Sequence, residues 1–286
     1  MKDNNHKKFF SLLSDTTFKY LFKKEENKPF FRETILDVTG IDINGYTLID
    51  NEINSGNNKK DYWLDILLKK DDSIINIEMN QFISRNYYNP TSLKNRNYLY
   101  SLASSTYTSG DKFKIKYITQ INFNNSLCPT DKHITNVTFK LADTKHNVYL
   151  DDIKIHEIYL ESFKHSCYTN LGNKDYRLLM FTAKSFTKMK ALAGTDKEAL
   201  NIVDELEKLN KDKYFGGLYD NEVIQKKLNN SYHDESYNEG YNLGKKETTK
   251  EIALNMLKMQ IDIKTISEVT NLSFDEIKSI IENKKS

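Results

Sequence analysis

Two strand-like segments joined by a tight acidic turn constrain the fold of this chain more than any other feature. The strands and the turn between them occupy residues 63–68, 74–80 and 71–72. A two-residue hairpin turn at this place pairs Lys70 with Ser73. Counting back along both strands then places Asp65 directly opposite Glu78, with about 4.5–5.5 Å between their Cβ atoms.

An opposed pair of carboxylates inside a hydrophobic hairpin needs a compensating positive charge, because like charges placed directly opposite each other are destabilising. A divalent cation with oxygen ligands is the simplest compensation. Since strand side chains alternate, Asp65, Glu78 and Asn80 share one face. The opposite face is apolar and consists of Leu64, Ile66, Leu68, Ile75, Ile77 and Met79. The pattern predicts a metal-dependent enzyme. The alternative is a solvated hairpin face that carries two ordinary acids.

Composition narrows the class of protein. The net charge of +2 over 286 residues gives no global basic field, so nucleic-acid binding requires a local basic surface. The 12% of aromatic residues argue for a folded core. The two cysteines lack CxxC spacing, and the six histidines form no metal-ligand spacing.

No apolar run reaches the roughly 18 residues of a membrane span, and the N-terminus lacks a signal-peptide core. A soluble, cytoplasmic protein without membrane contact is expected.

Helix and strand signals alternate in the first part of the chain and become helical after about Asp175. Ser14 is typical of a helix start, and Pro29 and Gly40 mark the two ends of a second helix. A further helix is expected over 91–108, and strands over 46–53, 113–123, 136–141 and 153–160. Later, Leu178, Leu179 and Phe186 are assigned to one helix, 218–230 to a connector or short helix, and Ser273 with Glu276 to a capping box.

The hairpin and its flanking segments resemble the PD-(D/E)xK nuclease fold and, more narrowly, the Rpn family of recombination-promoting nucleases and putative transposases. The matching segments are 14–22, 64–66, 75–79, Arg96 with Tyr100 before Gly110, 239–244 and 270–277. The resemblance implies an α/β fold with a mixed central sheet flanked by helices and an α-helical C-terminal extension. The expected divisions are a nuclease-like core over 1–174, a helical extension over 175–232, and a tail over 233–286 that ends in a small helix-turn-helix-like unit.

The resemblance also implies magnesium-dependent hydrolysis of DNA phosphodiester bonds, with manganese as a substitute, in recombination or mobile elements. Asp65 and Glu78 would be metal ligands. Asn80 stands where the fold has a lysine and the family usually has glutamine; it is neutral and shorter, but can still orient water or a phosphate oxygen. Glu52 is the favoured third acidic ligand, with Asp50 and Asp61 as alternatives.

Basic residues near the hairpin are candidates for phosphate binding. Arg96 and Tyr100 lie four residues apart on one helical face, so Arg96 can grip a phosphate while Tyr100 packs beside it. The alternative for Arg96 is a tether to a structural carboxylate. Lys19, with Lys23 and Lys24, is a candidate for steering phosphate, against a merely solvated helix face.

Two other readings of the function stay open. One is a non-catalytic DNA-binding or interaction protein on the same scaffold, which Asn80 favours. The other is a nuclease that acts on RNA. The C-terminal helices are candidates for contacts between copies of the chain.

Overall fold

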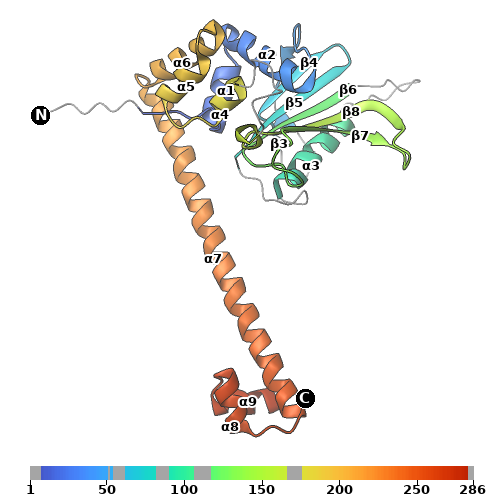
Figure 1. The fold of residues 1–286 in the computed structure, drawn as a ribbon, viewed down its shortest axis with the longest axis vertical. Helices are drawn as coiled ribbons and strands as arrows, with labels where there is room; N and C mark the ends of the chain where they lie inside the picture. The colour runs from blue at the N-terminus through green and yellow to red at the C-terminus, as the bar shows by residue number, and fades with distance from the viewer. Residues whose placement is uncertain are drawn as a thin grey trace, which may run out of the picture. The chain divides into compact units, whose positions relative to one another are not determined.

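A mixed six-stranded sheet forms the centre of the computed structural model, which describes residues 8–50, 52–53, 62–81, 90–105, 117–165 and 176–282 (Figure 1). Its strands, in spatial order, are β1 (Thr47–Leu48), β4 (Ile66–Lys70), β5 (Ser73–Asn80), β6 (Tyr117–Asn124), β8 (Val148–Tyr159) and β7 (Asn136–Ala142). The pairs β5–β6 and β6–β8 are parallel, and the other neighbours are antiparallel. Two short strands, β2 (Glu52–Ile53) and β3 (Tyr62–Trp63), pair separately. The expected α/β class is confirmed.

The acidic hairpin has the predicted register. Lys70 pairs with Ser73 across a turn in which Asp71 has a φ of 49°. The last pair at the open end is Ile66 with Ile77, so Asp65 and Glu78 stand at the next step of the ladder. The predicted apolar face is buried in the main core. Leu64 was wrongly assigned to that face: the chain bends at Asp65, the alternation breaks there, and Leu64 packs on the opposite side of the sheet.

One face of the sheet is covered by helices that build the main core. They are α1 (Asp15–Phe22), α2 (Lys28–Thr39), α4 (Tyr176–Phe181), α5 (Phe186–Ala193) and α6 (Lys197–Leu209). Ser14 caps α1 by accepting a hydrogen bond from the Thr17 amide, and Gly40 ends α2 with a φ of 72°, as predicted. Leu178 and Phe186 lie in two helices rather than the one expected, because Ser185 starts α5 as its N-terminal cap.

Helix α3 (Pro90–Ser105) lies on the opposite face of the sheet (Figure 1). A smaller cluster joins α3 to the strands through Leu64, Leu67, Ile74, Tyr98, Leu99, Leu102 and Ile118. The helix expected over 91–108 begins at Pro90, and its predicted end lies outside the described residues. This cluster covers only part of the face, and the buried polar side chains of Asn76, Glu78 and Asn122 lie beside it on the same face.

The C-terminal part contains a long helix, α7 (Lys213–Lys258). The segment 218–230, expected to be a connector or short helix, is helical, but it is part of α7 and neither a connector nor short. The chain forms two compact units, up to Glu222 and from Val223. In the second unit, α8 (Ile263–Thr270) and α9 (Phe274–Glu282) pack with the end of α7 around Ala253, Ile266, Leu272 and Ile277. The capping box is confirmed by reciprocal bonds between Ser273 and Glu276. None of the described helices combines the length and apolar character needed to cross a membrane.

A buried histidine on β8 makes folding stability depend on pH. His156 is 5% exposed, and its Nδ1 lies 3.0 Å from the Thr138 hydroxyl. Burial, followed by the charges of Lys154 and Lys140, lowers its pKa to about 4. The unfolded chain then takes up the proton first as pH falls from about 6.5. The stability that the neutral His156 contributes is fully present above that pH and is lost as the pH falls through the pKa of the folded state.

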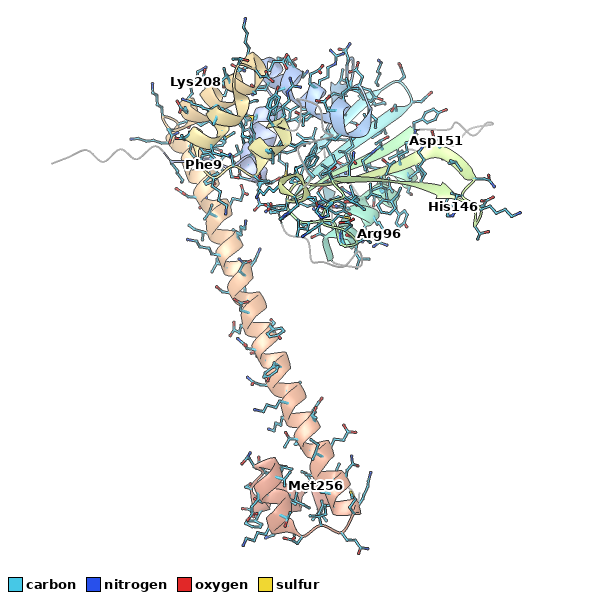
Figure 2. All side chains as sticks on the ribbon, in the orientation of Figure 1. Phe9, Arg96, His146, Asp151, Lys208 and Met256 are labelled. Atoms are coloured by element: carbon cyan, nitrogen blue, oxygen red, sulfur yellow. The ribbon has the colours of Figure 1, made fainter. Side chains whose placement is uncertain are left out.

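We expect the free energy of unfolding to fall by about 2 kcal/mol more in the parent than in His156→Gln between pH 7 and pH 4. Urea denaturation at both pH values measures the difference. His146→Asn is the control, because His146 lies in the exposed turn between β7 and β8 (Figure 2) and asparagine tolerates its φ of 66°. An equal fall in the free energy of unfolding between pH 7 and pH 4 for the parent and His156→Gln would contradict the expectation.

Candidate active site at the acidic hairpin

Two buried carboxylates close the open end of the hairpin. Asp65 is 8% exposed and Glu78 only 1%. The Asp65 amide donates to Glu78 Oε1 at 3.2 Å, and the Met79 amide donates to Asp65 Oδ2 at 2.8 Å. Each carboxylate thus uses one oxygen to satisfy a backbone N–H on the other strand. These bonds fix both side chains and leave the second oxygen of each for other partners.

A lysine holds each of those second oxygens. Lys19 Nζ, from α1, lies 3.0 Å from Asp65 Oδ1. Lys94 Nζ, from α3, lies 3.2 Å from Glu78 Oε2 and is placed over the Tyr98 ring. Burial opposes the charge on both lysines, but the facing carboxylates raise their pKa values above the usual range. The positive charge that the acidic pair requires is supplied here by two ammonium groups.

A third acid, Asp15, belongs to the same cluster. It lies 3.0 Å from Lys19 Nζ, and burial followed by the charge of Asp65 raises its pKa to about 6. Burial, with Asp65 as the next cause, also raises the pKa of Glu78 well above its usual value. Sequence reasoning placed the third acid at Glu52. The structure describes only the backbone of Glu52, and Asp61 lies outside the described residues.

Asn80 is held within the sheet by its neighbour on β6. It is 3% exposed, and its Nδ2 donates to Asn124 Oδ1 at 3.0 Å. The Asn80 Oδ1 is buried and has no hydrogen-bond partner among the described residues. An unsatisfied buried acceptor of this kind is costly unless a donor or cation reaches it. Asn80 therefore has one oxygen to offer at the edge of the acidic pair.

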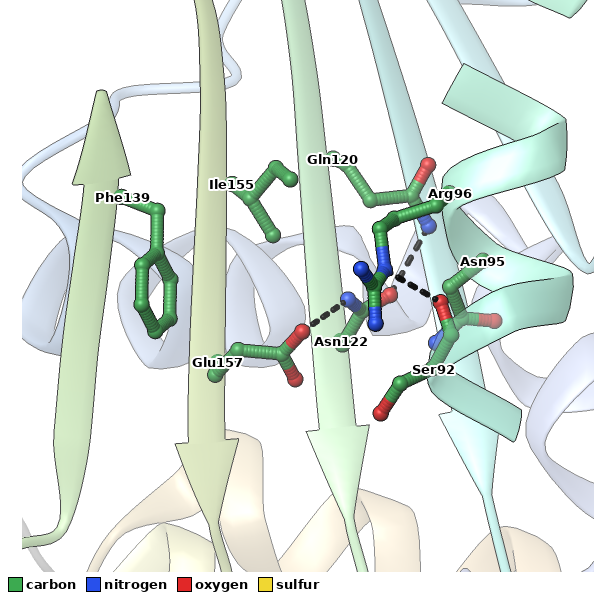
Figure 3. Close-up of a pocket in the computed structure, with 8 residues that line it drawn as sticks. All are labelled: Ser92, Asn95, Arg96, Gln120, Asn122, Phe139, Ile155 and Glu157. Atoms are coloured by element: carbon green, nitrogen blue, oxygen red, sulfur yellow. Dashed lines mark hydrogen bonds between the residues drawn. The ribbon is translucent and has the colours of Figure 1, made fainter. Parts of the chain in front are cut away.

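The other predicted phosphate ligands lie apart from this pair. Arg96 lines a cavity together with Glu157, and its Nε donates to the Ser92 carbonyl at 3.3 Å (Figure 3). Its charge counteracts the rise that burial causes in the pKa of Glu157. Tyr100 is 64% exposed on α3. Phosphate binding by Arg96 and Tyr100 stays a prediction. Lys24 pairs with Glu205.

Comparison with known protein families identifies the family of the chain. Residues 12–223 match the model of the PD-(D/E)XK nuclease family transposase. The chain belongs to this family. The match spans the sheet, both lysine-bearing helices and the first turns of α7. No curated protein and no solved structure matches the chain. Membership supports a nuclease-like or transposase-associated function with DNA as the substrate, and nucleases of this family typically use divalent metals.

The oxygen donors of the acidic cluster fit a small hard cation. Among the described residues, no group of three or more His, Cys, Asp or Glu side chains is placed to hold a metal ion. Magnesium, however, usually takes one or two protein carboxylates and keeps several waters. Asp65 Oδ1 and Glu78 Oε2, now on lysines, are carboxylate oxygens of that kind. Asn80 Oδ1, which has no partner among the described residues, adds a neutral amide oxygen.

Sequence reasoning missed Lys94 and the position of Asp15 in the acidic cluster. Asp15 and Lys19 are four apart on α1, a spacing typical of a helical ion pair, so this signal was present in the sequence. Lys94 and Tyr98 have the same spacing on α3. Nothing in that spacing says that the Lys94 ammonium reaches across to β5, because that contact depends on how α3 packs on the sheet.

Proposed function

We propose that this chain is a metal-dependent DNA endonuclease of the recombination-promoting (Rpn) kind, which hydrolyses phosphodiester bonds with magnesium or manganese. One observation carries the proposal. Asp65 and Glu78 each fix one oxygen on the hairpin backbone and present the other to a cation, here a lysine ammonium. The family to which the chain belongs supports the same reaction class.

The residues of the site have distinct roles in this proposal. A metal ion on Asp65 and Glu78 would supply a polarised phosphate oxygen and a bound water of lowered pKa. Lys94, whose side chain is 42% exposed, holds positive charge at the outer side of Glu78 and stabilises charge that develops on the phosphate. Lys19 keeps Asp65 oriented and neutralised, and Asn80 Oδ1 accepts a hydrogen bond from the attacking water.

Digestion of DNA and RNA side by side tests the proposal. We expect purified protein to cut DNA with magnesium or manganese and to leave it intact in EDTA. Intact DNA under every metal condition would reject the endonuclease. RNA cut in preference to DNA would reject DNA as the substrate. The competing non-catalytic DNA-binding module, which the amide at Asn80 favours, predicts DNA affinity without any metal-dependent heat in calorimetry.

Asn80 stands where the PD-(D/E)xK fold has a lysine, and we expect Lys94 to supply the positive charge of that missing lysine. We expect Lys94→Gln to lower the metal-dependent cleavage rate by about 10–100-fold, because a preorganised cation that faces the developing charge is lost. Initial rates at saturating magnesium measure the effect. Lys188→Gln, an exposed lysine on α5, is the control and should keep the parent rate. Equal rates for Lys94→Gln and the control would remove Lys94 from the mechanism.

A further inference from the structure

A cavity of about 340 Å³ lies under α3, beside the acidic pair but on different strands. Its walls come from α3, β6, β7 and β8, and the close-up shows Phe139 and α3 on opposite sides of it (Figure 3). The lining residues are Ser92, Asn95, Arg96, Gln120, Asn122, Phe139, Ile155 and Glu157. The proposed hydrolysis uses none of these side chains, so their grouping calls for a separate explanation.

The cavity combines a strong acceptor with a strong donor. Glu157 accepts one hydrogen bond at each oxygen, from Asn122 Nδ2 at 2.8 Å and from Asn124 Nδ2 at 2.6 Å. An ionised carboxylate has about four acceptor positions, so acceptor capacity remains. Arg96 only donates. Asn95, 4% exposed, adds an Oδ1 that is buried and has no partner among the described residues. A ligand that fits must therefore present donors and acceptors on separate edges.

An aromatic ring gives the cavity a flat wall. Phe139 on β7 is 41% exposed, and Ile155 stands next to it on the paired strand β8. Rings of this kind stack on the faces of nucleobases. A planar base stacked on Phe139 would lie within the lining that includes Glu157 and Arg96. The flat wall and the polar groups thus both favour a nucleobase as the ligand.

The cavity is connected to the acidic pair through the sheet. Glu78, Asn122 and Glu157 are register partners on β5, β6 and β8, so they stand in one row on one face. Two strand spacings separate Glu78 from Glu157, which is about 10 Å. Asn76 Nδ2 bridges the two regions by donating to Glu78 Oε1 and Gln120 Oε1. A nucleotide that flanks a phosphate at Glu78 can place its base over this row.

We propose that this cavity binds an unstacked guanine base of the nucleic-acid substrate next to the scissile phosphate. Guanine offers N1–H and N2–H donors to the Glu157 carboxylate, and its O6 and N7 acceptors suit an arginine such as Arg96. Cytosine and adenine each offer only one exocyclic amine as a donor, and thymine offers only one ring N–H. The inference rests on the proposed nuclease function and names the base that such a site reads.

Nucleotide titration of the metal-free protein tests the cavity without cleavage. In EDTA, we expect 2′-deoxyguanosine 5′-monophosphate to shift the side-chain amide NMR signals of Gln120 and Asn122, and to bind about tenfold more tightly than the adenine or thymine nucleotide. Phe139→Leu should weaken binding about tenfold through lost stacking. Leu141→Val, at an exposed position on the same strand, is the matched control and should bind as the parent does.

Three results would overturn the proposal: no binding of the guanine nucleotide, equal binding of the guanine, adenine and thymine nucleotides, or parent-like binding by Phe139→Leu. Cleavage separates it from the proposed function. Asp65→Asn should still bind the guanine nucleotide while it fails to cut, and Phe139→Leu should cut with less preference for guanine beside the break. Guanine binding by a parent protein that leaves DNA and RNA intact would reject the nuclease and support the cavity as a guanine-nucleotide site.

Discussion

Replacement of Asp65 by asparagine is expected to lower metal-dependent DNA cleavage by about a thousandfold or more. The change removes one of two carboxylates on which the cation depends, and with it the stabilisation of charge on the phosphate. Asparagine keeps the shape of the side chain, and its Oδ1 can still accept from the Met79 amide, which is 2.8 Å from Asp65 Oδ2. Lys19 retains Asp15 as a partner. Single-turnover cleavage at saturating magnesium measures the loss.

The control for Asp65→Asn is Asp72→Asn, which removes an exposed carboxylate from the turn of the same hairpin. It should cut DNA at the parent rate. Parent-like cleavage by Asp65→Asn would exclude Asp65 as a metal ligand. Circular dichroism and urea denaturation of both variants separate lost chemistry from lost folding, because a carboxylate-to-amide change at a buried ion pair also costs stability.

The hairpin was predictable because its register follows from short-range rules. A two-residue turn and the alternation of side chains suffice to pair Lys70 with Ser73 and to place Asp65 beside Glu78. The neighbours of those acids were not predictable in the same way. Lys19 and Lys94 approach from helices on different faces of the sheet, and only the packing of those helices decides which side chains meet.

Arg96 illustrates the same limit. Its distance of four residues from Tyr100 correctly predicts a shared helix, but not which part of the sheet α3 covers. Arg96 lines the cavity at the Glu157 end of the polar row, while Lys94, two residues earlier, reaches Glu78 at the other end. A helix rotates by about 100° per residue, so a shift of two positions changes the strand that a side chain faces.

The first turns of α7 explain why residues 218–230 continue a long helix instead of forming a connector or short helix. Phe215 is buried in the main core, and Tyr219 packs against Phe10 with ring centroids 5.0 Å apart. Tertiary contacts of this kind sustain a helix whose own apolar pattern is weak. One turn further along, Glu222 makes the contact that ties α7 to the candidate active site.

The Glu222 carboxylate caps the N-terminus of α1. It accepts hydrogen bonds from the Ser14 hydroxyl at 2.6 Å and from the Asp15 and Thr16 amides at 3.0 Å each. It also accepts from Gln81 Nε2 at 2.7 Å, next to Asn80 on β5. Burial would raise its pKa, but these bonds, led by the Ser14 hydroxyl, hold the pKa below its usual value. A helix N-terminus stabilises an anion in this position.

Glu222→Ala is expected to lower the free energy of unfolding of the unit that ends at Glu222 by about 3 kcal/mol. Four charge-assisted hydrogen bonds are lost together, each ordinarily about 1.5–3 kcal/mol and not additive, while water partly replaces the carboxylate. For a unit of this size the shift in melting temperature is about 6–12 °C. Because α1 carries Asp15 and Lys19 into the acidic cluster, cleavage should also fall. Urea denaturation and cleavage rates on the same preparation measure both effects.

Glu235→Ala, an exposed glutamate on the same helix, should change neither stability nor rate. Stability equal to that of Glu235→Ala would show that the Glu222 cap contributes nothing to holding α1 in place.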